Sequence, residues 1–222
     1  EAAVPCPDLR LVLVGGSKLD ATLRRSLAAM APAAEIREFY GAAETSFITI
    51  ADATAPEASV GRAYEGVQIS LDASGEVWVK SPYLFMGYAT TEGGTKWRDG
   101  WLSVGEIGTL AGGFLFLSGR AGRMVTVADQ NVFPEEIEAL MEGLRGIRRA
   151  AVLPVRDDKR GMVLIAMVQG DPAAEPEILA GLRARLGPLK APKALFWQAD
   201  WPLLASGKTN LRAREARVRW PM

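Results

Sequence analysis

Three short stretches of this 222-residue chain combine residue types that could take part in chemistry. Gly15-Gly16-Ser17 follows an apolar run, and a glycine pair at the carboxyl end of a strand lets a flat ring approach the backbone closely. Tyr40-Gly41-Ala42-Ala43-Glu44 places an aromatic ring four residues before a carboxylate. Ser206-Gly207-Lys208 carries a compact cation on a pliable loop. Taken alone, the three stretches also fit an ordinary turn, a core aromatic residue and a surface lysine, respectively.

The first 58 residues contain a strand–helix–strand pattern that would position two of these stretches. Leu9–Val14 is nearly continuously apolar, which is typical of a strand buried on both faces of a parallel sheet. Glu35–Tyr40 alternates as a second strand. Asp20 can cap a helix between them, and four apolar residues follow at helical spacing: Leu19, Leu23, Leu27 and Met30. Ligands of such sheets bind at the carboxyl ends of the strands.

Residues 59–117 contain short strands with close turn signals, which indicate a small barrel or a distorted sandwich. Strands are predicted at Val67–Leu71 and Glu76–Lys80, with a turn at Asp72–Gly75. Gly112-Gly113 stands between two apolar segments and can adopt the positive φ angles of a two-residue hairpin. Residues 97–101 are interpreted as a turn.

From Arg123 onward the pattern is that of a small α+β unit. Pro134 suits the first position of a helix, and the two carboxylates after it suit the positive end of the helix dipole. The predicted elements are a hairpin at 124–132, helices at 134–144 and 176–186, strands at 148–155, 162–169 and 193–198, and a basic helix at 210–219. The arginines of that last helix most simply form a solvated face.

Composition narrows the class of protein. The chain is 49% hydrophobic, which supports a real core, and 26 basic residues balance 26 acidic ones, which gives no hint of nucleic-acid binding. Cys6 alone excludes an internal disulfide framework and suits a reducing cytoplasm. No apolar run approaches the ~18 residues of a membrane span. The absence of histidine excludes general-base catalysis by histidine within the chain. Because residue 1 is glutamate, we expect a fragment, a processed product or a shortened chain.

Several segments, in order and at plausible spacing, resemble the signature motifs of the adenylate-forming superfamily, which includes acyl-CoA synthetases, adenylation domains of peptide synthetases and luciferases. They are Gly75–Pro82, Met86-Gly87-Tyr88, Asp99–Leu102, Gly105–Gly108, Gly119-Arg120 and Asn131–Glu138. The resemblance covers nearly the whole chain but only the later part of a full-length member. It implies an α/β plus α+β protein: the end of a parallel-sheet α/β subdomain, a small β-barrel-like subdomain and a separate C-terminal α+β domain.

The domain boundaries expected on this basis are residues 1–58 for the remnant of the nucleotide-binding domain, 59–119 for the barrel-like subdomain, 120–123 for a hinge and 124–222 for a mobile C-terminal domain. Ser206-Gly207-Lys208 would then contain the catalytic lysine, Lys208. Glu44 would hold Mg²⁺, consistent with the preference of that ion for oxygen ligands. The residues implied to bind nucleotide are Gly15, Gly16, Ser17, Tyr40, Gly41, Ala42, Glu44, Glu106 and Arg120.

Four positions depart from the family pattern. Ala43 lacks the hydroxyl that contacts phosphate, which a neighbour such as Thr45 could supply. Glu106 replaces the aspartate that binds the ribose hydroxyls. Gly122 replaces an aspartate or lysine at the pivot, and Asp129 replaces a glycine that lines the tunnel for the thiol.

The implied activity has two half-reactions. A carboxylic acid and Mg-ATP form an acyl-adenylate and pyrophosphate, with Lys208 stabilising the developing charge. The C-terminal domain then rotates about Gly122, and the thiol of coenzyme A attacks the adenylate. Family prevalence favours a fatty or other hydrophobic acid. The expected cofactors and substrates are ATP, Mg²⁺ and coenzyme A, with no nucleic acid or membrane span. Homodimerisation stays open.

Two alternatives remain at this stage. The chain could belong to an adenylation domain that loads a carrier-protein thiol, or to a degenerate relative that binds without catalysis. The family's phosphate loop and most of its acyl pocket have no counterpart in these residues. We therefore expect the 222 residues alone to bind nucleotide weakly and not to turn over.

Overall fold

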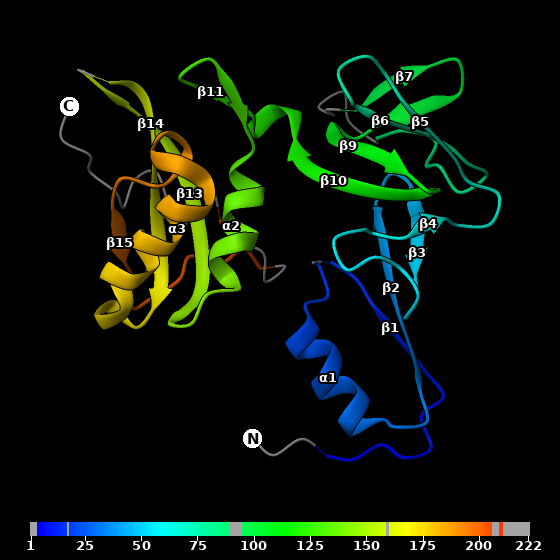
Figure 1. Cartoon of the computed structure of the whole chain (residues 1–222). Helices are drawn as coiled ribbons and strands as arrows, with labels where there is room; N and C mark the ends of the chain where they lie inside the picture. The colour runs from blue at the N-terminus through cyan, green and yellow to red at the C-terminus, as the bar shows by residue number, and fades with distance from the viewer. Residues whose placement is uncertain (1–3, 17, 89–94, 159, 206–208, 211–222) are drawn as a thin grey trace. The chain divides into compact units, whose positions relative to one another are not determined.

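The protein was analysed as a computed structural model that describes residues 4–16, 18–88, 95–158, 160–205 and 209–210 (Figure 1). The chain divides into two compact units, residues 1–121 and residues 122–222. The fold class expected from the sequence is confirmed, since small mixed sheets and few helices form an α/β plus α+β chain. None of the helices in the described ranges is long and apolar enough to cross a membrane.

The first sheet contains β1 (Leu11–Val14), β2 (Glu35–Ala42), β3 (Ser46–Ala51) and β4 (Arg62–Ala63) in that order. β1 and β2 are parallel, whereas the remaining pairs are antiparallel. The helix α1 (Ala21–Met30) connects the parallel pair, and the Asp20 carboxylate caps it by accepting from the N–H groups of Thr22 and Leu23. This is the strand–helix–strand pattern expected from the sequence.

The expectation that β1 is buried on both faces is wrong for this chain. Leu11 and Leu13 are 47% and 49% exposed. β1 lies at the edge of the sheet, where its only strand partner among the described residues is β2. Apolar content predicted a buried strand, but burial also requires a covering layer, and the described residues provide none on this side of β1.

The rest of the first unit is built from two further sheets. One contains β5 (Gln68–Leu71), β6 (Val77–Lys80), β8 (Trp101–Ser103) and β7 (Lys96–Arg98), and the other is a hairpin of β9 (Glu106–Ala111) and β10 (Phe114–Arg120). The described strands form no closed barrel. One shared core includes Ile48, Val77, Val79 and Leu115, so the sheets pack as a distorted sandwich.

Two turns in this region show which features could be predicted from the local sequence and which could not. Gly112 and Gly113 have φ angles of +58° and +81°, as expected for the hairpin between β9 and β10. Residues 97–101, by contrast, are not simply a turn. Trp97 and Trp101 lie in paired strands, and only Asp99 and Gly100, with φ of +51° and +80°, form the turn.

The second unit is a two-layer α+β arrangement. Its strands are β11 (Val125–Val127), β12 (Gln130–Val132), β13 (Ile147–Asp157), β14 (Gly161–Gly170) and β15 (Leu195–Trp197), with the last three in one sheet. Apolar residues of α2 (Pro134–Glu142) and α3 (Glu175–Lys190) share a core with that sheet. Short 3₁₀ turns occur at Ala121–Arg123 and Pro172–Ala174. The basic helix expected at 210–219 lies almost wholly outside the described residues.

Arg123 connects the first residues of the second unit to α2 and β13 through hydrogen bonds and an ion pair. Its guanidinium forms two hydrogen bonds with the Glu138 carboxylate, at 3.0 and 2.7 Å, and an ion pair with Glu135 at 3.2 Å. Glu138 Oε1 also accepts the Val152 N–H at 2.7 Å. The Arg123 side chain is only 20% exposed, so this pair is largely shielded from water. Arg123 thereby links the 3₁₀ turn, α2 and β13.

We expect Arg123→Ala to destabilise the second unit by about 3 kcal/mol, because it leaves the partly buried Glu138 without its cation. Urea unfolding followed by native-state hydrogen exchange of the β13 and β14 amides, which belong to the second unit, would measure the effect. The control is Arg148→Ala, which removes an exposed arginine from β13 and should change stability little. Equal effects of the two substitutions would contradict the structural role of Arg123.

Candidate functional site

A carboxylate and a guanidinium meet across the hairpin of β9 and β10. Arg120 is the direct strand partner of Glu106, and its Nε donates to Glu106 Oε1 at 3.0 Å. A register shift between Leu117 and Gly119 produces this pairing. Without that bulge, Arg120 would oppose Gly105 rather than Glu106. The bulge therefore aligns the two charges.

The two members of this pair differ in exposure. The Glu106 side chain is 12% exposed, whereas that of Arg120 is 63% exposed. The carboxylate is thus largely fixed by the protein, and the guanidinium keeps donors directed to solvent. A ligand with hydroxyl or phosphate groups could be recognised by such a combination of acceptor and donor.

Tyr40, near the end of β2, lies close to this pair. Burial raises the pKa of the Tyr40 phenol strongly, the negative charge of Glu106 raises it further, and the positive charge of Arg120 opposes both effects. Tyr40 is therefore neutral at physiological pH. Its hydroxyl is buried and has no hydrogen-bond partner among the described residues, while its ring packs against the core that contains Ile48. The structure brings Tyr40, Glu106 and Arg120 together.

Gly41 and Ala42 shape the turn that follows Tyr40. A Cβ atom at Gly41 would lie 1.9 Å from the Ser46 carbonyl oxygen, so only glycine fits this bulge between β2 and β3. The Ala42 N–H donates to Thr45 Oγ1 at 3.0 Å. Thr45 is fully buried, and its hydroxyl lies within reach of the carbonyl oxygens of Ala42 and Ser46. Thr45 therefore closes this turn, and the idea that it replaces the hydroxyl missing at Ala43 is not supported.

Glu44 lies in the same turn and contacts a different part of the first unit. The Tyr88 hydroxyl donates to Glu44 Oε1 at 2.5 Å, and this interaction raises the pKa of Tyr88. The described residues include no group of three or more His, Cys, Asp or Glu side chains that could hold a metal ion. A single accessible carboxylate is nevertheless the kind of ligand set that Mg²⁺ uses when water and phosphate oxygens complete its shell.

The glycine pair expected to approach a ligand is packed against the sheet on one side. A Cβ atom at Gly15 would lie 2.3 Å from Cζ of Phe39, and Gly16 has a φ of +94°. The backbone conformation therefore favours glycine at position 16, whereas a side chain at position 15 would collide with the Phe39 ring. Ser17 and Lys208, also predicted as site residues, lie outside the described residues.

An ion pair between the exposed Lys18 and the buried Glu38, which the sequence analysis missed, fixes the chain directly after these glycines. Lys18 Nζ lies 2.6 Å from Glu38 Oε2 and donates to the Ser59 carbonyl oxygen at 2.7 Å. Glu38 is 2% exposed and also accepts the Leu19 N–H at 3.0 Å. The available signal was a charged residue at an inward position of β2, between Ile36 and Tyr40. This pair connects the glycine segment to the strand that carries Tyr40.

Comparisons with known proteins give a consistent result. Residues 2–89 match the family model described as AMP-binding enzyme, and residues 136–208 match the model of the AMP-binding enzyme C-terminal domain. The chain is 31% identical to the uncharacterized acyl-CoA ligase YhfT of Bacillus subtilis, over 94% of this chain and 45% of that protein. It is 28% identical to the medium/long-chain-fatty-acid–[acyl-carrier-protein] ligase FadD10 of Mycobacterium tuberculosis, over 91% and 43%.

The fold is shared with a solved structure. The o-succinylbenzoate CoA synthetase of Bacillus subtilis, in complex with its acyl-adenylate intermediate, superposes with a TM-score of 0.84 at 25% identity, covering 97% of this chain and 48% of that enzyme. The chain thus spans less than half the length of the relatives it matches.

The contacts of Thr45 lead to a first prediction for this site. Thr45→Val keeps the shape of the side chain but removes the acceptor of the Ala42 N–H, so we expect a loss of about 1–2 kcal/mol in the free energy of unfolding. Nucleotide affinity, measured by calorimetry at a temperature where the variant is folded, should be unchanged. A selective loss of affinity without a loss of stability would instead show that Thr45 contacts the ligand directly.

Proposed function

Because this chain belongs to the adenylate-forming superfamily, we propose that the protein containing it is an ATP-dependent acid–CoA ligase acting through an acyl-adenylate. The observation that carries the proposal is the convergence of Tyr40, Glu106 and Arg120 in the first unit. These residues come from three different strands, and each has the chemistry needed for one part of a nucleotide.

The nucleotide roles follow from the properties of these side chains. The Glu106 carboxylate accepts hydrogen bonds from the ribose hydroxyls, and the exposed donors of Arg120 reach the same sugar. The Tyr40 ring, which is neutral and fixed against the core, provides an apolar surface for the adenine. Gly15 and Gly16 let the ligand approach the backbone, and Ser17, Gly41 and Ala42 complete the set of residues proposed to bind nucleotide. Glu44 provides a carboxylate oxygen for Mg²⁺, which neutralises phosphate charge when bound.

Catalysis of adenylate formation is assigned to Lys208. Its ammonium bridges the substrate carboxylate and the α-phosphate, and it stabilises the negative charge that accumulates as the carboxylate oxygen attacks. Pyrophosphate leaves as the new O–P bond forms. No general base is required, because the carboxylate is already ionised at neutral pH.

The proposed rotation between the two half-reactions is supported by the way the connecting residues are anchored. Arg120 binds Glu106 within the first unit, and Arg123 binds Glu138 within the second. Only Ala121 and Gly122 separate these arginines. Gly122 has no Cβ atom to restrict its backbone angles, so it can serve as the pivot.

We expect Lys208→Ala in the full-length protein to lower the rate of adenylate formation by about 100- to 1000-fold, as is typical when one preorganised electrostatic contact is lost. ATP–pyrophosphate exchange would measure this step alone. Lys190→Ala, a substitution in α3 of the same unit, is the control and should leave the rate unchanged. An unchanged rate in Lys208→Ala would favour the alternative that this is a non-catalytic binding relative.

The acyl acceptor has two candidates, coenzyme A and a carrier protein. One relative, FadD10, is named as an acyl-carrier-protein ligase, so the second candidate has direct support from the comparisons. The turn that contains Asp129 is also relevant to the choice between these two acceptors. Ala128 and Asp129 form the turn between β11 and β12 with φ of +48° and +61°, a conformation that favours glycine. The chain thus has a charged residue at a turn position whose backbone conformation would be less strained with glycine.

We expect Asp129→Gly to stabilise the second unit by roughly 0.5–1 kcal/mol, since glycine adopts positive φ without strain. If coenzyme A is the acceptor and Asp129 narrows its path, the same change should also raise the rate of thioester formation with free coenzyme A. Single-turnover thiolysis of the preformed adenylate would measure that rate. A stabilised variant that still fails to use free coenzyme A would favour the carrier protein.

A further inference from the structure

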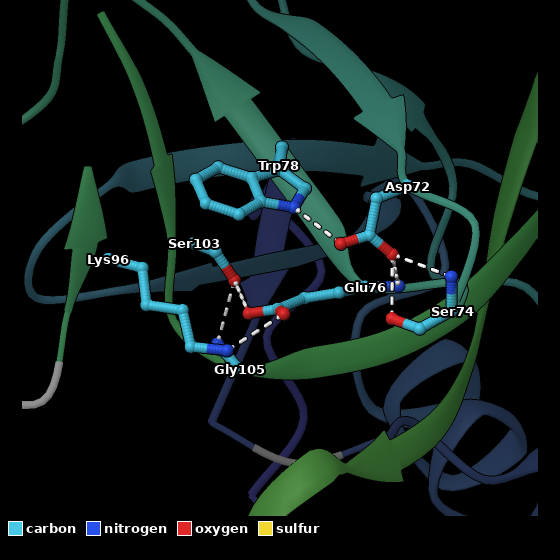
Figure 2. Close-up of polar contacts among 7 residues, drawn as sticks. All are labelled: Asp72, Ser74, Glu76, Trp78, Lys96, Ser103 and Gly105. Carbon is cyan, nitrogen blue, oxygen red and sulfur yellow. Dashed lines mark hydrogen bonds and ion pairs between the residues drawn. The ribbon is translucent and has the colours of Figure 1, made fainter. Parts of the chain in front are cut away.

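A buried carboxylate links the loop before Glu106 to the neighbouring sheet. Figure 2 shows Glu76, directly before β6, between Lys96 of β7 and Ser103 of β8. Glu76 is 6% exposed; its Oε2 pairs with Lys96 Nζ at 2.9 Å, and its Oε1 accepts the Ser103 hydroxyl at 2.6 Å. Ser103 is 1% exposed and accepts the Gly105 N–H at 3.0 Å. We call Lys96, Glu76, Ser103 and Gly105 the Glu76 relay.

Each hydrogen bond of the Glu76 relay has a fixed donor and a fixed acceptor. The Ser103 hydroxyl has a single proton, which it gives to the carboxylate, and this orients its lone pairs for the Gly105 N–H. Lys96 compensates the charge of the buried carboxylate. Because each donor and acceptor is used by the next member, a change at Glu76 alters the hydrogen bond received by Gly105.

Gly105 immediately precedes Glu106, and the backbone on both sides of Glu106 is held in the same way. Gly105 has a φ of +79°, and its carbonyl oxygen accepts the Ala121 N–H at 2.8 Å. The Gly108 N–H donates to the Gly75 carbonyl oxygen at 2.9 Å, and Glu76 itself forms a β-bridge with Ile107. The orientation of the Glu106 side chain therefore depends on the segment that contains Glu76.

From this arrangement we infer that Glu76 and Ser103 are positioning residues that hold Glu106 in the orientation needed to bind the ribose hydroxyls. The inference rests on the proposed function, in which Glu106 accepts those hydroxyl protons. Neither Glu76 nor Ser103 contacts the ligand in this mechanism. Their effect is specific to the 2′- and 3′-hydroxyl groups, because they act through the carboxylate that binds them.

The same sheet provides a matched control. Asp72 forms a similar, neighbouring set of contacts, in which it accepts from the Ser74 hydroxyl at 2.6 Å, from the indole N–H of Trp78 at 3.2 Å and from the backbone N–H of Glu76 at 3.1 Å (Figure 2). Hydrogen bonds, the largest effect being that of the Ser74 hydroxyl, lower the pKa of Asp72 to about 2. Ser74 therefore makes the same hydroxyl–carboxylate contact as Ser103 and at the same length, but the Asp72 carboxylate meets Glu76 only at its backbone N–H and not at the side chain that binds Ser103.

The test compares ATP with 2′,3′-dideoxy-ATP, which lacks both ribose hydroxyls, in calorimetric binding to the full-length protein. The quantity of interest is the ratio of the two dissociation constants. Ser103→Ala should weaken ATP binding by about fivefold, equivalent to one hydrogen bond, and leave dideoxy-ATP binding unchanged. Glu76→Gln, which keeps the size of the side chain but removes its charge, should shift the ratio in the same direction. Ser74→Ala should not change it.

Two outcomes separate the inference from the proposed function. Glu106→Ala should remove the preference for ATP; if it does not, the ribose role of Glu106 is wrong. If Glu106→Ala removes the preference but Ser103→Ala and Glu76→Gln lower the affinity for both nucleotides equally, the relay is only structural and the inference is wrong. Thermal unfolding identifies a variant that does not fold, and the other relay variant then decides the result.

Discussion

The register between β9 and β10 is the constraint on which the candidate site depends. A single bulge between Leu117 and Gly119 determines whether Arg120 faces Glu106 or Gly105. Charge pairing alone could not select this register, because exposed ion pairs contribute little free energy. The Gly112-Gly113 turn and the burial of Leu115 fix the pairing from Phe114 to Leu117, and the bulge then shifts it by one residue. The chemistry at the end of the hairpin thus depends on its turn, its core and this one-residue shift.

Three glutamates, two of them buried and one partly buried, fix the backbone around the functional side chains. Glu38 accepts from Lys18 and the Leu19 N–H, Glu138 accepts from Arg123 and the Val152 N–H, and Glu76 accepts from Lys96 and Ser103. In each case a cation compensates the carboxylate, and a further hydrogen bond makes its position directional. Glutamates of this kind hold the glycine segment, the start of the second unit and the loop before Glu106. Removing one partner of such a pair would cost more than the pair contributes as a whole.

Local sequence signals predicted most helices, strands and turns, but they did not predict which of these would be buried or paired. The Asp20 cap, the Gly112-Gly113 turn and the helix that begins at Pro134 depend on contacts between near neighbours, so they could be identified from the sequence. The exposure of Leu11 and Leu13 depends on which residues cover β1, and the strands of Trp97 and Trp101 join a sheet with the distant β6, so no periodic pattern indicated either feature. The motifs indicated Tyr40, Glu106 and Arg120 by resemblance, whereas Glu76 looked like a purely structural strand residue.

Under the proposed function, the distribution of these residues along the chain separates binding from catalysis. Tyr40, Glu106 and Arg120 all belong to residues 1–121, and the hydrogen bond between Glu106 and Arg120 and the effect of both charges on Tyr40 lie within that unit. The core of residues 122–222 is likewise self-contained, since two helices and a three-stranded sheet bury their apolar faces together. A nucleotide held by the first unit would therefore keep its contacts while the second unit changed position. This independence is what a ligase needs if one lysine is to act in the first half-reaction and withdraw before the second.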